Sequence, residues 1–382
     1  HLRGHVALRG VTFGYDPAVN AGESLTSVTA PTGAASSYSY GTTAATQYQV
    51  AKGKDAQGNE SIVAFNGAGN AMGTTDAAGA SATVTRNADG TIDTATTPKG
   101  AATTTDYTND ANKQPVTINP PGTDLGNRTY SYDGYGRIAT YTSGRGITET
   151  YSYDAADRVT TVDYDDATPN VTYGYDTAGR VQTRTDASGT TSYGYDPLGR
   201  LTTRQHTAGG GQLSYGYDLV GNLTTETDGA GTTTHAYDSR NLIASTVTPD
   251  GRTIRYAHDS DGRRTDTWFA TNADNTAWAA HTKSTYDAAD RLTRVWTARN
   301  SSDTTRVSDL SYSYAAPASS TACPTAVAAG TDTGMRWTKT DNLTGKTTSY
   351  CYDKANRLTR ATTPGADSWT YSYEPSWIWQ RL

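Results

Sequence analysis

The side chains that could do chemistry are few in this chain of 382 residues, and their spacing does not favour catalysis. No serine lies in a Gly-x-Ser-x-Gly sequence, and neither cysteine has a sequence neighbour that would activate it as a nucleophile. The histidines, which could act as general bases, are scattered: His1, His5, His206, His235, His258 and His281. The sequence therefore predicts no catalytic residue.

Two short acidic groupings could supply oxygen ligands to a metal ion. They are Asp163-Tyr-Asp165-Asp166 and Asp259-Ser-Asp261-Gly262. The second begins like a calcium-binding loop, but its twelfth position, where such a loop needs a bidentate glutamate, is Ala270. Both groupings are better interpreted as solvated turns, so we expect no metal ion and no cofactor.

The two cysteines, Cys323 and Cys351, lie in the last sixth of the chain. They have no Cys-x-x-Cys spacing and lack the further ligands that zinc needs. Two alternatives remain: a pair of inert buried thiols, or one disulfide between strands that closes a loop of about 30 residues. Such sparing use of cysteine fits a large secreted protein.

One motif repeats through the middle of the chain and must set the positions of all these side chains. It consists of Tyr-Asp, two variable residues, Gly or a substitute, Arg, and an aliphatic residue. Its aspartates are Asp133, Asp154, Asp176, Asp196, Asp218, Asp238, Asp259, Asp287 and Asp353. The first seven are 20 to 22 residues apart, and gaps of 28 and 66 residues precede the last two. A fixed period of this kind is typical of repeat architectures.

Each copy of the motif predicts a β-hairpin. Tyrosines two residues apart, as in Tyr173-Gly-Tyr175, face the same side of a strand. The aspartate opens a turn by accepting backbone hydrogen bonds, and a glycine three residues later supplies a positive φ. Clear examples of that glycine are Gly179, Gly199 and Gly221. Its substitutes, which tolerate the left-handed region, are Asp157, Asp290 and Asn356. The Arg-Leu-Thr that follows starts the return strand.

The regularity of the repeat divides the chain into three segments. Residues 1–128 keep the turn chemistry but lose the Tyr-Asp pair, and we interpret them as degenerate hairpins; the stretch 67–82 could instead be a flexible linker. Residues 129–295 form the regular array. Residues 296–382 hold an irregular insertion with the cysteine pair and then terminal repeats, and the abrupt change of pattern after residue 373 suggests a truncated chain or a capping tail.

Composition excludes several classes of protein. Leu, Val, Ile and Phe make up only about 11% of the chain, which raises the possibility of disorder, but the net charge is −6 and 27 tyrosines supply apolar area. No apolar run is long enough to span a membrane. Lysines and arginines are spread singly, which argues against nucleic acid as a partner.

These observations predict an all-β fold. If the period held throughout, a flat sheet of about 36 strands would extend about 170 Å. Twisted open sheets rarely exceed about 10 to 15 strands. We therefore expect a long spiralling antiparallel sheet that forms a shell or a β-solenoid.

The Tyr-Asp-x-x-Gly-Arg-Leu units, with a further tyrosine two residues upstream, resemble the Rhs/YD-repeat family of teneurins and toxin-complex shells. The match is specific over residues 130–295 and 350–373, and the Thr/Ala/Gly-rich style is similar to actinobacterial versions. The resemblance implies a hollow shell on a secreted or cell-surface protein, often housing a toxic C-terminal polypeptide. Some members are also credited with carbohydrate binding. The self-cleaving aspartate signature of toxin-delivering members is absent from this sequence.

We therefore expect a non-enzymatic, extracellular scaffold whose partner is the remainder of its own polypeptide or a toxin cargo. One alternative is a carbohydrate-binding or cell-surface adhesion module that binds a cell-surface or cell-wall glycan. Its possible glycan contacts, where the repeat is interrupted, are Trp268, Trp278, Trp296 and Trp337. The other alternative is an enzyme with a site hidden among the turns.

Overall fold

The fold consists of β-strands joined by tight turns. The computed structural model describes residues 10–100, 104–122, 126–209, 211–270, 278–299, 303–323, 325–365 and 368–373. Over these ranges 31 strands belong to one antiparallel sheet, with short 3-10 segments at η1 (Asn20–Gly22) and η3 (Ala318–Ala322). The predicted all-β architecture of hairpins in an antiparallel sheet is confirmed. In the same ranges, no helix has the length and hydropathy that a membrane crossing needs.

Contacts divide the chain into two compact units. Unit 1 comprises His1–Asp106, Lys283–Thr297 and Arg306–Leu382, and unit 2 comprises Tyr107–Thr282 and Ala298–Thr305. The three-segment division expected from the sequence describes the regularity of the repeat rather than contacts, and it stays a prediction.

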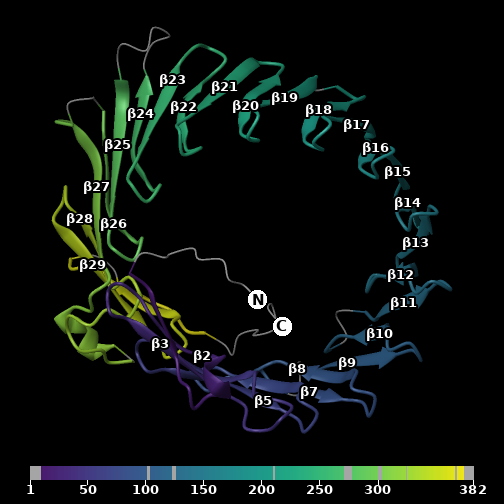
Figure 1. The fold of residues 1–382 in the computed structure, drawn as a ribbon, viewed down its shortest axis with the longest axis horizontal. Helices are drawn as coiled ribbons and strands as arrows, with labels where there is room; N and C mark the ends of the chain where they lie inside the picture. The colour runs from purple at the N-terminus through teal and green to yellow at the C-terminus, as the bar shows by residue number, and fades with distance from the viewer. Residues whose placement is uncertain are drawn as a thin grey trace. The chain divides into compact units, whose positions relative to one another are not determined.

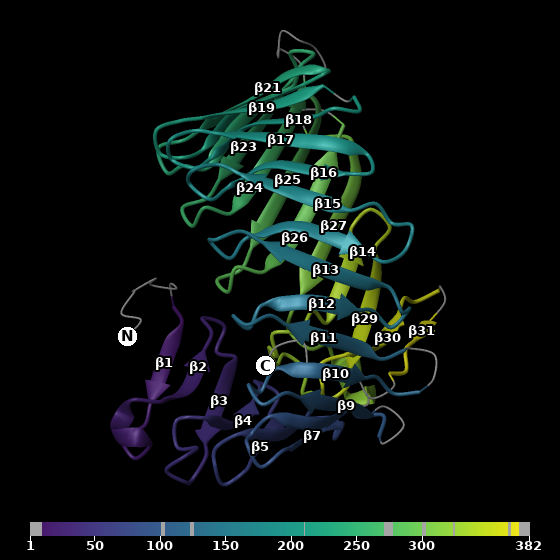
Figure 2. The same ribbon diagram turned by 90° about the vertical axis from the view of Figure 1, so that its right-hand side faces the viewer.

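The strands follow one another in chain order (Figures 1 and 2). Unit 1 begins with β1 (Thr12–Tyr15), β2 (Leu25–Thr29), β3 (Ala35–Tyr40), β4 (Val50–Lys54), β5 (Glu60–Phe65), β6 (Ala71–Thr75), β7 (Ser81–Arg86) and β8 (Ile92–Thr96). β9 (Thr104–Asn109) crosses into unit 2, which continues with β10 (Pro115–Asn119), β11 (Arg128–Tyr132), β12 (Ile138–Thr142), β13 (Thr148–Tyr153), β14 (Val159–Tyr164), β15 (Val171–Tyr175), β16 (Val181–Asp186) and β17 (Gly189–Tyr195). Then come β18 (Leu201–His206), β19 (Gln212–Tyr217), β20 (Leu223–Asp228), β21 (Gly231–Tyr237), β22 (Ile243–Val247), β23 (Thr253–His258) and β24 (Arg264–Ala270). β25 (Trp278–Tyr286) and β26 (Leu292–Ala298) cross between the units, and unit 1 ends with β27 (Arg306–Ser313), β28 (Thr338–Asp341), β29 (Lys346–Tyr352), β30 (Leu358–Thr362) and β31 (Ser368–Thr370).

Each repeat contributes two strands and a bulged turn, as the motif predicts. Between β15 and β16 the register shifts at Gly174/Tyr175, and the N–H of Gly179 donates to the carbonyl of Asp176 at 3.0 Å. Gly179 has a φ of 83°. The substitutes Asp157, Asp290 and Asn356 have φ values of 61°, 62° and 61°. These residues adopt the left-handed conformation that the bulge requires.

The stretch 67–82 is not a flexible linker, so that alternative is wrong. It contains β6 and the start of β7, joined by a turn in which Asp76 Oδ1 accepts the N–H groups of Ala78 and Ala80 at 2.9 and 2.8 Å. Ala82 is completely buried. The turn aspartate provides the same backbone bonds here as in the regular repeats, although no tyrosine precedes it.

Unit 2 is a curved sheet in which each strand pairs with the next, and β10 to β24 follow an arc in Figure 1. Threonines face one another across many of these strands. Examples are the hydroxyl pairs Thr142–Thr148, Thr185–Thr190 and Thr227–Thr232, which are 3.1, 2.8 and 2.8 Å apart. Such cross-strand pairs stabilise a sheet that has few aliphatic residues.

Unit 1 holds the main cluster of buried apolar side chains. Its members are Ala316, Cys323, Val327, Trp337, Cys351 and Tyr352, which join the insertion before β28 to β29. A second contact joins segments that are distant in sequence, because Asn356 Nδ2 donates to Asp55 Oδ2 at 3.0 Å. The turn between β4 and β5 therefore meets the turn between β29 and β30.

Candidate functional site: repeat junctions and a disulfide-bonded insertion

The aspartate of each motif organises its own turn. Asp176 Oδ1 accepts the N–H groups of Ala178 and Arg180, both at 2.9 Å, while Oδ2 accepts Arg180 Nε at 2.7 Å. The same three bonds form at Asp133, Asp154, Asp196, Asp259, Asp287 and Asp353. The backbone N–H of Arg180, together with its guanidinium, lowers the pKa of the Asp176 carboxyl.

Two motif aspartates depart slightly from this arrangement. Asp218 keeps both backbone bonds, but its second oxygen accepts the Asn222 amide at 2.8 Å because no arginine is present. Asp238 accepts Arg240 Nε at 3.2 Å, from a position two residues on. Every motif aspartate is thus held within its own turn.

The arginine also contacts the next repeat. The Arg180 guanidinium lies 4.6 Å from the ring centroid of Tyr195, and its Nη1 donates to the carbonyl of Asp196 at 3.1 Å. The Tyr195 hydroxyl donates back to the carbonyl of Val181 at 2.8 Å. We call this set the repeat junction: the arginine and following carbonyl of one motif, with the tyrosine and aspartate carbonyl of the next.

Repeat junctions recur along the regular array. Arg158 lies 4.4 Å from the Tyr175 ring and Arg200 lies 4.7 Å from the Tyr217 ring. The corresponding tyrosine hydroxyls donate to Val159 and Leu201 at 2.6 and 2.9 Å. Sequence reasoning gave the arginine only a place at the start of the return strand, although its recurrence in nearly every copy was the signal for this second contact.

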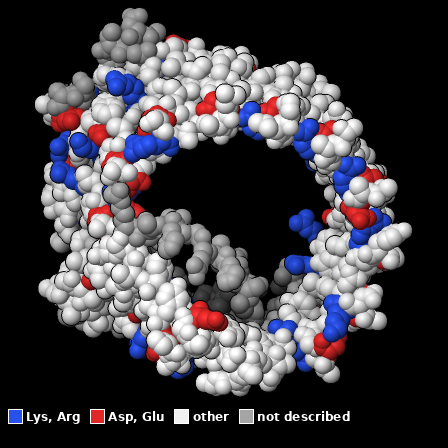
Figure 3. Space-filling view, in the orientation of Figure 1, with Lys and Arg blue, Asp and Glu red and all other residues white. Residues whose placement is uncertain are grey.

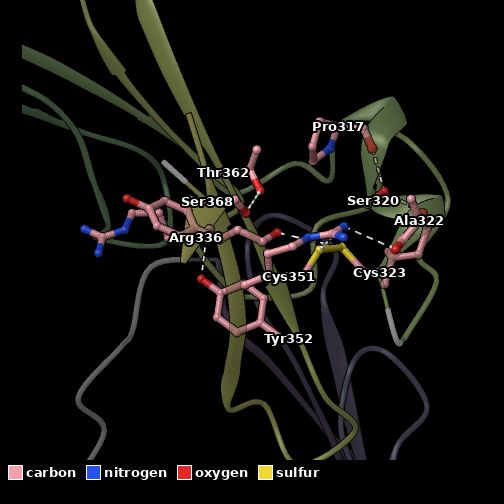
Figure 4. Close-up of a disulfide and its surroundings, with 12 residues drawn as sticks. Pro317, Ser320, Ala322, Cys323, Arg336, Cys351, Tyr352, Thr362 and Ser368 are labelled. Carbon is pink, nitrogen blue, oxygen red and sulfur yellow. Dashed lines mark hydrogen bonds between the residues drawn. A yellow bond between two sulfur atoms is a disulfide. The ribbon is translucent and has the colours of Figure 1, made fainter. Parts of the chain in front are cut away.

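The insertion before β28 is joined to β29 by a disulfide. Cys323 and Cys351 have an S–S distance of 2.06 Å and Cα atoms 5.3 Å apart (Figure 4). Beside it, completely buried Trp337 packs edge-on against Tyr352 with ring centroids 5.4 Å apart. Burial raises the pKa of Tyr352 to about 12. The disulfide therefore lies in the apolar cluster of unit 1.

One cysteine has a charged neighbour that the sequence did not suggest. Arg360 Nη2 lies 3.2 Å from Cys351 Sγ. Sequence reasoning missed this contact, because it considered only nearby sequence positions. Cys351 and Arg360 are opposite one another on β29 and β30.

The comparisons with known proteins agree with this geometry. Residues 72–235 match the family model described as the teneurin YD-shell. Over these residues, somewhat less than half of its length, the chain is similar to the YD-shell family. No curated protein sequence matches it.

Solved structures share the fold of this YD-repeat chain. A crystal structure of TcdB2-TccC3 matches with a TM-score of 0.68 at 15% identity, covering 92% of this chain and 20% of that one. A Photorhabdus luminescens Tc holotoxin pore matches with a TM-score of 0.69 at 16% identity, covering 92% and 19%. The chain thus spans about a fifth of the length of these proteins, and its antiparallel sheet has the same fold as the part that it matches.

The four tryptophans proposed as glycan contacts differ in exposure. Trp296, which is 7% exposed, and Trp337 are buried, so the structure does not leave them available to a glycan. Trp268 is half-buried and stacks on His281, with ring centroids 4.8 Å apart. Trp278 is half-buried under Arg255. A glycan contact at Trp268 or Trp278 stays a prediction.

Two buried polar clusters were missed by sequence reasoning. His281, 4% exposed, has ring nitrogens 2.9 Å from Asp266 Oδ1 and 2.7 Å from Asp303 Oδ1. In the other, Asp309 accepts both Arg294 Nε and Nη2, at 2.8 and 2.7 Å, and Arg306 Nη1 at 2.5 Å. The Arg294 guanidinium holds the pKa of Asp309 well below its usual range. Asp266 and His281, like Arg294 and Asp309, are 15 residues apart on different strands, so no local motif marks these contacts.

The remaining candidate residues have partners of ordinary structural kinds. His235 Nδ1 lies 3.0 Å from Thr246 Oγ1, and Asp166 Oδ1 accepts the N–H of Thr168 at 2.8 Å within a turn. His1 and His5 lie outside the described residues. Over the described ranges, no three His, Cys, Asp or Glu side chains come together as a metal site. Acidic and basic side chains are interspersed on the face drawn in Figure 3.

Proposed function

We propose that this chain forms part of the wall of an extracellular shell that encloses or presents another polypeptide, and that it catalyses no reaction. The observation that carries the proposal is the repeat junction, which links neighbouring hairpins of the regular array through an arginine stacked on the next tyrosine and a bond from that tyrosine's hydroxyl to a backbone carbonyl. These side chains are engaged in holding hairpins together. The arrangement suits a continuous wall rather than a site that turns over substrate.

The partner is proposed from the likeness of this chain to solved structures. The similar structures are described as complexes of toxin components, which supports the remainder of the same polypeptide or a toxin component as the enclosed partner. The Cys323–Cys351 disulfide supports an oxidising, extracellular location.

Electron microscopy of the purified, oxidised chain tests the wall. We expect density for a thin β-sheet wall around an unfilled interior. A flat sheet, or a solid stack of sheets, would overturn the proposal for this chain and favour adhesion through its outer face.

A protease-protection experiment tests enclosure separately. A short unstructured reporter peptide would be fused after the last residue, and the control would carry the same reporter in the turn at Leu219, which is 100% exposed. If the wall encloses its partner, proteinase K should digest the control reporter at least about tenfold faster than the fused one. Equal digestion of both would contradict enclosure while leaving the wall intact.

A further inference from the structure

The last repeat carries an unusual pair of opposed side chains. In the regular array, the residue between the two tyrosines is glycine at Gly174, Gly194 and Gly216 and serine at Ser131 and Ser152, and each is opposite a threonine. A Cβ atom on Gly174 would lie 2.4 Å from Thr183 Oγ1, so at the glycine copies the threonine hydroxyl occupies this space, while the serine copies pair hydroxyl to hydroxyl, as Ser131 and Thr140 do at 2.7 Å. In β29 and β30 both members differ, and Cys351 is opposite Arg360.

The Arg360 guanidinium contacts one cysteine and the residue before the other. Its Nη2 lies 3.2 Å from Cys351 Sγ and 3.2 Å from the carbonyl oxygen of Ala322, the residue before Cys323. Figure 4 shows Ala322 and Cys323 beside Cys351, at the end of η3. The positive charge of Arg360 thus lies against the sulfur of Cys351 in particular.

A cavity of about 550 Å³ reaches the disulfide. Both cysteines line it, together with Arg360, Ser319, Ser349 and Thr362. Cys323 and Cys351 are 8% and 5% exposed, so protein covers most of each residue, but the cavity gives a small molecule a route to the sulfurs.

We propose that this disulfide is a thiol-exchange site with a fixed polarity, in which a small thiolate attacks Cys323 and Cys351 is the leaving group. The incoming sulfur forms a bond to Cys323 Sγ, the Cys323–Cys351 bond breaks, and its electron pair remains on Cys351 Sγ. The Arg360 guanidinium stabilises that thiolate, and exchange is faster when the leaving thiolate is more stable.

A second thiolate completes the reaction. It attacks the sulfur of the bound small molecule, which leaves as a disulfide of two small thiols and releases Cys323 as a thiolate. Two electrons pass from the small thiols to the protein disulfide. The segment that carries Cys323 is then no longer cross-linked to β29 and stays attached only through the backbone, so exchange frees the insertion without unfolding the sheet.

The first test maps the mixed disulfide. The oxidised chain would be incubated with glutathione under native conditions, quenched with acid and digested, and the modified cysteine identified by mass spectrometry. We expect glutathione on Cys323. Glutathione on Cys351, equal amounts on both, or reaction only in denaturant would overturn the proposal.

The second test measures the role of the arginine. R360Q should slow reduction by glutathione by about three- to tenfold, and R360K should be intermediate because it keeps the charge. The matched control is R252Q, because Arg252 pairs with Asp250 at an exposed site away from the disulfide. An R360Q rate equal to that of the wild type would overturn the role of Arg360. If R360Q fails to fold, the mapping on the wild-type chain still decides the polarity.

Limited proteolysis tests the release of the insertion. After reduction and alkylation, proteinase K should cut between residues 314 and 337 at least about fivefold faster than in the oxidised chain, with the regular array uncut. Unchanged cleavage there would show that exchange does not free the insertion.

Discussion

At the scale of single residues, the motif arginines of the regular array can have partners on both sides of a repeat boundary, as Arg180 shows. Arg180 bonds the carboxylate of Asp176 in its own turn, stacks on the Tyr195 ring of the next, and donates to the Asp196 carbonyl. A guanidinium suits this position because it is planar, always charged and carries several donors. Lysine could not make all three contacts at once.

The tyrosine hydroxyl of a repeat junction should contribute measurably to stability. Tyr175→Phe removes the 2.6 Å bond to the carbonyl of Val159 and keeps the ring under Arg158. We expect a loss of about 1 kcal/mol in the free energy of unfolding, measured by urea denaturation. The control is Tyr135→Phe, at a turn tip that is 85% exposed, which should change nothing. If both variants changed the free energy of unfolding equally, the Tyr175 hydroxyl would make no specific contribution to the repeat junction.

Substitution of Asp309 should reduce the stability of the chain more than substitution of an exposed aspartate. Asp309→Asn leaves Arg294 and Arg306 beside a neutral, 2% exposed side chain. We expect a loss of about 1 to 3 kcal/mol, because the buried charge-assisted bonds of Asp309 are lost while the two arginines, 40% and 34% exposed, stay partly solvated. Asp250→Asn, whose partner Arg252 is largely exposed, should cost at most about 0.5 kcal/mol. Thermal unfolding of the two variants under the same conditions gives the comparison.

At the scale of elements, the hairpin turn depends on one left-handed residue. Gly199 has a φ of 83°, and a Cβ atom there would meet Arg180 Nη1 at 3.6 Å, which is an ordinary contact. The cost of Gly199→Ala therefore comes from the backbone alone, and we expect about 1 to 2 kcal/mol.

A second turn glycine is the matched control for that substitution. Gly134 has no positive φ, and a Cβ atom there would meet nothing within 4 Å. Gly134→Ala should leave the free energy of unfolding unchanged or raise it by up to about 1 kcal/mol. A loss at Gly134 as large as that at Gly199 would show that the effect is not conformational. Urea denaturation distinguishes these outcomes.

The hairpins could be predicted from the sequence because their determinants are local. Tyr-Asp, the glycine and the arginine lie within six residues, so turn chemistry and alternation determine the element. The degenerate repeats follow the same rule, since Asn66 accepts the N–H groups of Ala68 and Asn70 as an aspartate would. The contacts of Asp266 with His281 and of Arg294 with Asp309 could not be predicted, because each joins residues on different strands with no fixed offset. Arg360 was missed for the same reason, since its contact with Cys351 depends on strand register.

At the scale of the whole molecule, stability is spread along an array and not concentrated in a large core. Over the described ranges, the cluster of buried apolar side chains lies at the insertion. The regular repeats instead contact their neighbours through repeat junctions and threonine pairs. Repeat arrays of this kind gain stability approximately as a sum of neighbouring interfaces. A small change in each turn therefore adds up over many copies.

Lowering the pH should reveal the summed contribution of the turns to stability. The turn aspartates Asp133, Asp154, Asp176, Asp196, Asp238, Asp259 and Asp287 all have pKa values lowered in the folded chain. Because the folded pKa is below the unfolded value of about 3.9, the stabilisation is present above pH 4 and is lost as pH falls through the folded pKa values. We expect a thermal midpoint that is nearly constant from pH 5 to 7 and falls steeply below about pH 4.

The steepness of the fall distinguishes a collective effect from a single group. If many turns take up protons together, Asp196→Asn should lower the midpoint at pH 7 but reduce the acid slope only slightly, since the other copies still titrate. The measurement is the thermal midpoint followed by circular dichroism from pH 2 to 7 in both chains. If this one substitution abolished the dependence of the thermal midpoint on pH, a single carboxylate would control acid unfolding. The repeats would then contribute unequally to it.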